Sequence, residues 1–147
     1  MSTTSTFVQG TRTSLLALST LASATYLASS AYVASTNSPV DIAIEVTCNP
    51  NGTPTSPFQL EVYIQASLDG TNFQTGPTSG TDATNNSDLT LMGTVPCNDT
   101  NDHTRMFSVY STLGFIPKQF KIVCRNNMGV ALTSGNVYTA EISAVSA

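Results

Sequence analysis

Strict alternation of apolar and polar residues runs through the stretch FQLEVYIQASLDGTNF, residues 58–73, and constrains the fold more than any other feature. Every second residue from position 58 to position 68 is apolar. Because side chains alternate between the two faces of a β-strand, this pattern predicts a strand with one face in the core and the other in water. Asp69-Gly70 follows, and this pair suits the positive φ angles of a type I′ turn, so we expect a tight hairpin there. The stretch therefore predicts a half-buried antiparallel sheet.

Similar alternation recurs along the chain, separated by turn residues. Residues 40–48, 89–95, 105–113 and 137–145 alternate in the same way, as does the segment around Phe120, Ile122 and Cys124. Asn126-Asn127-Met128-Gly129 predicts a second hairpin, since Asn and Gly tolerate left-handed backbone conformations. About eight short strands with turns every 8–12 residues or so are typical of an all-β fold. We expect an antiparallel β-sandwich or jelly-roll-like barrel with a flexible N-terminal arm and little helix.

The length of 147 residues fits one domain. Its first six residues, MSTTST, offer nothing to bury, so we expect residues 1–12 to be an arm and residues 13–147 to be a single β-sandwich domain. Residues 14–33 are apolar in places, but serines and threonines interrupt them, so they lack the apolar core of a signal peptide and the length of a membrane span. This segment is expected to belong to the fold.

The charge pattern excludes several classes of partner. Only 10% of the residues are charged and the net charge is −4, which argues against binding to nucleic acid or to anionic membranes. The one concentration of basic residues comprises Lys118, Lys121 and Arg125. A solvated strand face is the simplest interpretation of these three residues, and a docking patch for an acidic protein surface is the alternative.

Residues with catalytic or metal-binding chemistry are sparse. His103 is the sole histidine and lies in a polar turn, where we expect it to be solvated rather than part of a Ser-His-Asp site. Asp69 with Asn72, or Asp99 with Asp102, could contribute oxygens to calcium, but a calcium site takes 6–8 oxygens and the turn explains Asp69 without a metal, so calcium stays the lesser alternative. No cysteines are spaced for zinc. The sequence therefore predicts no enzymatic activity, no cofactor and no metal. A long polar loop at residues 74–87 is expected to be functional or mobile.

Three cysteines, Cys48, Cys97 and Cys124, make an odd number. Cys48 and Cys124 fall on the apolar phase of their strands, so we expect free, buried thiols that act as small hydrophobic side chains. A bridge between Cys48 and Cys124 stays open if their strands are neighbours.

Several segments resemble small virion proteins of tailed bacteriophages. They are SLDGTNF at 67–73, LTLMGTVPCN at 89–98, FIPKQFKIVCRNNMGVALTSG at 115–135 and SLLALSTLASATYLASSAYV near the start. The resemblance implies a non-enzymatic structural β-sandwich that is part of the virion, assembled in the host cytoplasm. Among the places that such a protein can occupy, the Ser/Thr-rich N-terminal arm and the neutral surface favour a capsid decoration (cement) protein that binds the major capsid protein or other virion proteins, as a homo-oligomer and as a trimer on the capsid.

Two alternatives accompany this hypothesis. One is a ring protein of the neck, collar or tail, and the other, from a different class, is a carbohydrate-binding or receptor-binding module. For the virion hypothesis, the expected protein contacts are the arm, the turn after residue 68 and the basic residues. They are Thr6, Phe7, Val8, Asp69, Gly70, Lys118, Lys121 and Arg125.

Overall fold

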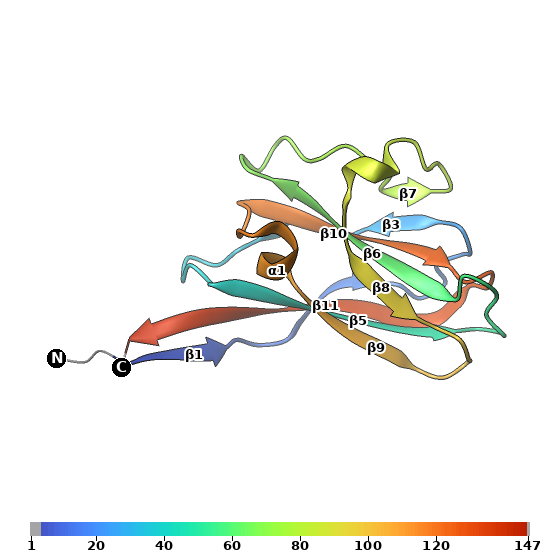
Figure 1. The fold of residues 1–147 in the computed structure, drawn as a ribbon, viewed down its shortest axis with the longest axis horizontal. Coiled ribbons are helices and arrows are strands. Elements are labelled where there is room, and N and C mark those ends of the chain that lie inside the picture. The colour runs from blue at the N-terminus through green and yellow to red at the C-terminus, as the bar shows by residue number, and fades with distance from the viewer. Residues whose placement is uncertain (1–3, 147) are drawn as a thin grey trace.

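Two antiparallel sheets packed face to face form the fold of residues 4–146, the part of the chain that the computed structural model describes (Figure 1). The first sheet has the order β1-β11-β5-β9, with β2 also paired to β11. The second has the order β7-β3-β10-β6-β8, with β4 also paired to β10. The strands of the first sheet are β1 (Ser5–Gln9), β2 (Thr13–Ala17), β5 (Asp41–Pro50), β9 (His103–Ser108) and β11 (Leu132–Ser146), and those of the second are β3 (Tyr26–Ala28), β4 (Tyr32–Val33), β6 (Gln59–Ser67), β7 (Ser79–Gly80), β8 (Thr90–Pro96) and β10 (Gln119–Asn127).

The core lies between the sheets and is built from the residues that alternate inward. The expected inward phases of β5, β6 and β10 are confirmed, and these side chains are almost completely buried. They are Ile42, Ile44, Val46 and Cys48 from β5, Leu60, Val62 and Ile64 from β6, and Phe120, Ile122 and Cys124 from β10. Burying one such aliphatic side chain contributes about 1.5–3 kcal/mol. The all-β sandwich predicted from the alternation is therefore confirmed.

The outward face of β6 is covered, contrary to the expectation that it faces water. The polar loop that follows β6 and the short 3₁₀ helix η1 (Asn86–Asp88) cross this face, and together they are called the cover of the second sheet (Figure 1). Leu89, at the end of the loop, packs with Tyr26, Tyr63 and Val123 in a second apolar cluster on the outside of the second sheet. The prediction of a wet face was wrong because alternation shows which residues share a face, but not whether another segment lies over it.

The two predicted hairpins are also wrong. Gly70 has a φ of +83°, but Asp69 lies outside the left-handed region. Past the turn the pairing stops after the bridge Ser67↔Phe73 and the hydrogen bond from the Gln74 N–H to the Ala66 carbonyl at 3.0 Å, so no second strand of a hairpin follows. The ladder partners of β6 are instead β8 and β10, which lie far away in the sequence. The turn at 126–129 leads from β10 in the second sheet to β11 in the first, so it crosses between sheets. Turn-forming residues thus predicted the reversals but not the strands that they join.

Two local departures from regular strand explain the remaining differences. The stretch 105–113 is not one strand, because α1 (Val109–Leu113) begins after β9 with Ser108 as its N-cap, whose side chain accepts a hydrogen bond from the Ser111 N–H. In β8 a bulge near Gly93 shifts the register, which leaves Leu91 exposed while Val95 is buried. None of the helical segments in residues 4–146 has the length and apolar character needed to cross a bilayer.

Candidate interaction surface

A two-stranded extension projects from one end of the sandwich (Figure 1). It consists of β1 and the last five described residues of β11, 142–146, which pair antiparallel from Ser5↔Ser146 to Gln9↔Ile142. Residues 5–9 of the expected arm are thus a paired strand, while residues 1–3 lie outside the described part of the chain. The division into an arm and a sandwich domain stays a prediction.

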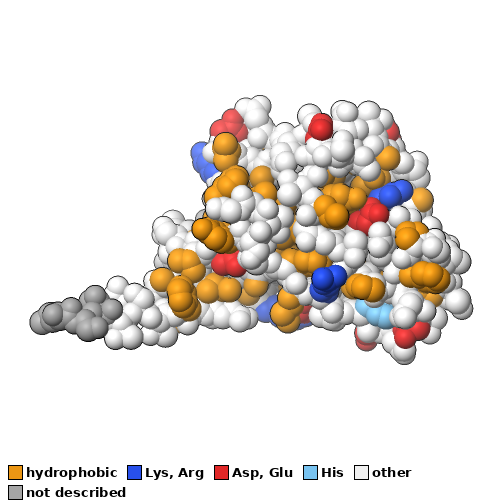
Figure 2. Space-filling view, viewed as in Figure 1, with side chains coloured by type: hydrophobic (Ala, Val, Ile, Leu, Met, Phe, Trp, Pro, Cys, Tyr) orange, Lys and Arg blue, Asp and Glu red, His pale blue; other side chains and the backbone are white. Residues whose placement is uncertain are grey.

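Both faces of this extension carry exposed apolar side chains. Phe7 is 69% exposed and lies opposite Ala144, so these two share one face. Val8 and Val145, each 49% exposed, lie on the other face because they are one position away from Phe7 and Ala144 in their strands. Figure 2 shows hydrophobic side chains at the surface where the extension leaves the sandwich.

The edges of the extension are open and uncharged. β1 is the terminal strand of its sheet, and β5 pairs with β11 only as far as Ile142↔Asp41. Neither STFVQ nor ISAVS, the two strands of the extension, contains a charged residue. Natural edge strands are usually protected by charges, prolines or bulges, because their free N–H and C=O groups pair readily with another strand.

The root of the extension is held firmly to the first sheet. The Gly10 N–H donates to the Glu141 carbonyl at 2.7 Å, directly after β1. The Arg12 guanidinium binds the Glu45 carboxylate at 2.5 Å and lies 3.3 Å from the centre of the Tyr138 ring. Its hydrogen bond to Glu45 raises the pKa of Arg12. The direction in which the extension projects is therefore set by contacts within the sandwich.

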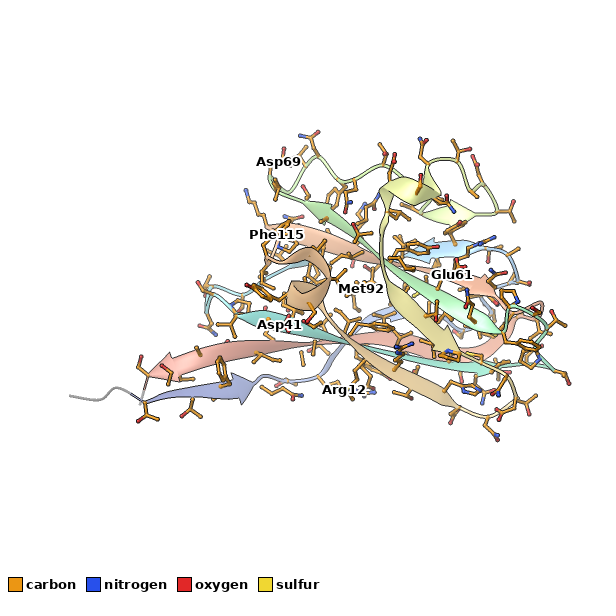
Figure 3. All side chains as sticks on the ribbon, in the orientation of Figure 1. Arg12, Asp41, Glu61, Asp69, Met92 and Phe115 are labelled. Carbon is orange, nitrogen blue, oxygen red and sulfur yellow. The ribbon has the colours of Figure 1, made fainter. Side chains whose placement is uncertain are left out.

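The predicted contact residues fall into three separate places. Thr6, Phe7 and Val8 lie in the extension and are exposed. Asp69 and Gly70 lie at the tip of the second sheet, away from the extension (Figure 3). The Asp69 carboxylate accepts the backbone N–H groups of Thr71 at 2.8 Å and Asn72 at 2.7 Å, and these bonds lower its pKa. The Asp69 carboxylate thus accepts its hydrogen bonds within the turn. Stabilising the turn is therefore a simpler role for Asp69 than binding another protein.

The basic residues do not form one free patch. The Lys121 ammonium lies 4.5 Å from the centre of the Phe73 ring. Arg125 lies 3.4 Å from the Glu61 carboxylate, and its guanidinium is over the ring of Tyr26. Lys121 thus contacts the residue from which the covering loop starts, Arg125 has its partners in the strands of the second sheet, and Lys118 precedes β10 in an exposed position. Their role in protein contacts, like that of the other predicted residues, stays a prediction.

A polar hollow of about 580 Å³ lies between this cover and the second sheet. Phe73, Gln74, Asp82 and Asn85 are among its lining residues, and Gln65 lies at its inner side. The buried Gln65 side chain donates to the Gln74 carbonyl at 2.6 Å, whereas its Oε1 atom has no hydrogen-bond partner. This Oε1 atom is itself buried, so the groups that the hollow presents are mainly the polar side chains of the loop.

His103 differs from its expected place. It begins β9 opposite Cys48, its side chain is largely buried, and its Nε2 lies 3.0 Å from Asp99 Oδ1. The expectation of a solvated loop histidine was therefore wrong. Among residues 4–146, no three histidine, cysteine or acidic side chains lie close enough together to hold a metal ion.

The cysteines are all unbridged and buried, and the neighbour of Cys48 is Cys97 rather than Cys124. The sequence does not indicate this pair, because Cys97 lies just beyond a strand, in a polar turn. Nor does it indicate residues 142–146 as part of the surface. The absence of charge in both end segments, STFVQ and ISAVS, is the available signal, and it does not show that these segments pair.

No protein-family model matches the chain, and no curated protein matches it. A solved structure described as "Bacillus endospore appendages form a novel family of disulfide-linked pili" is 12% identical over 95% of this chain and 88% of that chain, with a TM-score of 0.36. A structure of infectious bursal disease virus Gx strain is 12% identical over 97% of this chain and 42% of that chain, with a TM-score of 0.22. Neither match assigns a function to this chain. The proposed function therefore rests on the surface of the chain itself.

Proposed function

We propose that this protein is a non-enzymatic structural subunit that associates with copies of itself through the two-stranded extension. The observation that carries the proposal is that β1 and residues 142–146 project as an uncharged ribbon with exposed apolar side chains on both faces. A two-stranded ribbon without further packing is at best marginally stable in water. Contact with a neighbouring molecule supplies the packing that this ribbon lacks within its own chain.

The preferred occupant of the open edge is a second copy of the chain. The edge of β1 presents unpaired backbone groups and no charge, so an identical edge can pair with it without like-charge repulsion. Phe7 adds an aromatic side chain to such a contact, and aromatic residues bury about 150–250 Å² each. An edge that pairs with itself gives a closed dimer, whereas pairing with another surface of the neighbour gives a ring or filament.

The test compares the same substitution at two exposed apolar residues, one inside the extension and one outside it. Phe7→Asp puts a charge on the extension, and Leu68→Asp puts the same charge on the turn after β6, where the leucine is also highly exposed. Sedimentation velocity over a range of concentrations is expected to show an oligomer for the natural chain and for Leu68→Asp, but at least a tenfold weaker association for Phe7→Asp. Equal association of all three proteins would overturn the proposal.

The setting that we propose is the virion of a tailed bacteriophage, as the resemblance of several segments implies. There the protein would be a decoration protein on the major capsid protein, as a trimer, or a ring protein of the neck or tail. Quantitative mass spectrometry of purified virions separates these roles, since closed symmetric assemblies fix copy number. Hundreds of copies per particle indicate decoration, about a dozen indicate a ring, and absence from the particle contradicts both.

The polar hollow of the second sheet favours carbohydrate binding as a second candidate function. Its hydroxyl and amide groups suit the hydroxyls of a sugar, and Phe73 offers an apolar ring beside them. A glycan array probed with the full chain and with Phe73→Ala tests this function. Selective binding that the substitution removes supports it, and no binding by the natural chain contradicts it.

A further inference from the structure

Cys48 and Cys97 bring two sulfur atoms together from opposite sheets. Cys48 is an inward residue of β5 in the first sheet, and Cys97 directly follows β8 at the end of the second. Their Sγ atoms are 3.0 Å apart, although 49 positions separate the residues in the sequence. The two thiols are 2% and 0% exposed. This is the only contact between cysteine sulfur atoms among the described residues, and it joins the two sheets.

The backbone holds both residues in this arrangement. Cys48 lies in a ladder between Gly135 of β11 and His103 of β9. The Cys97 N–H donates to the Phe58 carbonyl at 2.7 Å, which fixes Cys97 to the segment before β6. A disulfide requires a sulfur–sulfur distance of about 2.05 Å, so the sulfurs need to approach by only about 1 Å.

Cys124 provides an internal contrast. It is fully buried in β10. It makes no sulfur contact like that of Cys48 with Cys97. Cys124 therefore serves as a small hydrophobic side chain.

We propose that Cys48 and Cys97 form a disulfide that joins the two sheets when the chain folds in oxidising surroundings. The oxidant is a low-molecular-weight disulfide such as oxidised glutathione. The thiolate of one cysteine attacks it and releases one glutathione thiolate, and the second cysteine then attacks the mixed disulfide and releases the other. Two protein thiols thereby lose two electrons and two protons, and one glutathione disulfide becomes two glutathione thiols. Since both sulfurs are buried in the folded chain, the bond forms before packing is complete.

This bond changes the stability of the chain rather than its fold. It closes the segment 48–97, which contains β6, β7 and β8 and the whole cover of the second sheet. Such a closure limits the freedom of the unfolded chain and prevents the sheets from separating. Chains that fold in an oxidising compartment meet conditions of this kind, whereas cytosolic proteins are kept reduced. The bond therefore stabilises a subunit that has folded in oxidising surroundings.

The experiment refolds the full chain with a mixture of reduced and oxidised glutathione or with a non-thiol reductant, and then alkylates free thiols under denaturing conditions. Trypsin followed by cleavage after glutamate places Cys48 in peptide 46–61, Cys97 in peptide 62–105 and Cys124 in peptide 122–125. The expected result is a disulfide-linked pair of peptides 46–61 and 62–105, with alkylation at Cys124 alone. A folded protein from the oxidising buffer with three alkylated cysteines, or a bond that includes Cys124, would overturn the proposal.

Thermal unfolding supplies a second measurement. The oxidised chain is expected to unfold about 10 °C higher than the reduced chain. Cys97→Ala is expected to lose this difference, whereas Cys124→Ala, which also removes a buried thiol, keeps it. If the substitutions prevent folding, the peptide linkage in the natural chain still decides the question. Identical melting temperatures of fully linked and reduced chains would contradict the stabilising role.

Discussion

Glu61 shows at the scale of one residue how polar groups are used on the covered face of the second sheet (Figure 3). Its carboxylate accepts hydrogen bonds from Tyr63 at 2.8 Å and Asn127 at 3.2 Å and forms an ion pair with Arg125. Burial acts to raise the pKa of Glu61, but the two hydrogen bonds and the charge of Arg125 together outweigh it, so the pKa is lowered. The charged form is therefore the one that stabilises the fold.

The pH dependence of stability follows from this direction. A carboxylate whose pKa is lowered by folding stabilises the protein fully above its unfolded pKa of about 4.3, and the effect is lost as the pH falls through the folded pKa. Glu61→Gln is expected to reduce the free energy of unfolding by about 1–3 kcal/mol at pH 7 and by clearly less at pH 3. Urea unfolding at both pH values measures the difference.

Glu45→Gln serves as the control for this substitution. Glu45 pairs with Arg12 at the surface, where an ion pair contributes about 1 kcal/mol or less. A smaller effect at pH 7 is expected for this variant. If Glu61→Gln were equally destabilising at pH 7 and pH 3, the network around Glu61 would not depend on its charge.

At the scale of elements, the cover of the second sheet depends on one apolar side chain. Leu89 packs with Tyr26, Tyr63 and Val123, whereas Leu91, two positions further, is exposed because of the bulge in β8. Leu89→Ala is expected to destabilise the protein by about 2–5 kcal/mol, and Leu91→Ala by about 0.5 kcal/mol or less. Urea unfolding of both variants measures this contrast. A similar loss of unfolding free energy in the two variants would mean that packing of Leu89 does not hold the cover in place.

The elements also show how far the sequence predicts the structure. The inward residues of β5, β6 and β10 follow from alternation, since the period of two fixes which side chains share a face. The cover over β6 does not follow, because its polar loop has only Leu89 as an apolar anchor and gives no periodic signal. Long-range pairing is equally hidden, and for this reason the Asp69-Gly70 turn was assigned to a hairpin that the chain does not form.

The candidate surface was predictable in part for the same reasons. Phe7 and Val8 stand out as apolar residues after a polar start, and they do lie exposed in the extension. Their pairing with residues 142–146 joins the two ends of the chain, which no local pattern reveals. The basic residues were grouped by sequence distance, whereas the fold gives Lys121 and Arg125 separate aromatic neighbours.

At the scale of the whole molecule, a well-packed sandwich carries an exposed ribbon that its own core does not support. The root of the ribbon is fixed by Arg12, while its end presents Phe7, Val8 and Val145 to the surroundings. In the assembly that we propose, the sandwich keeps its own fold and the ribbon makes the contact with the neighbouring subunit. Within the same sandwich, Cys48 and Cys97 are free and in contact, and the disulfide that we propose would join its two sheets.

Hydrogen–deuterium exchange of the natural chain at several concentrations tests the central claim most directly, since amides become protected where copies pair. The amides of residues 5–9 and 142–146 are expected to exchange more slowly as association increases, while those of the turn at 68–72 exchange at a constant rate. Unchanged exchange in the extension, with association still taking place, would contradict self-assembly through it.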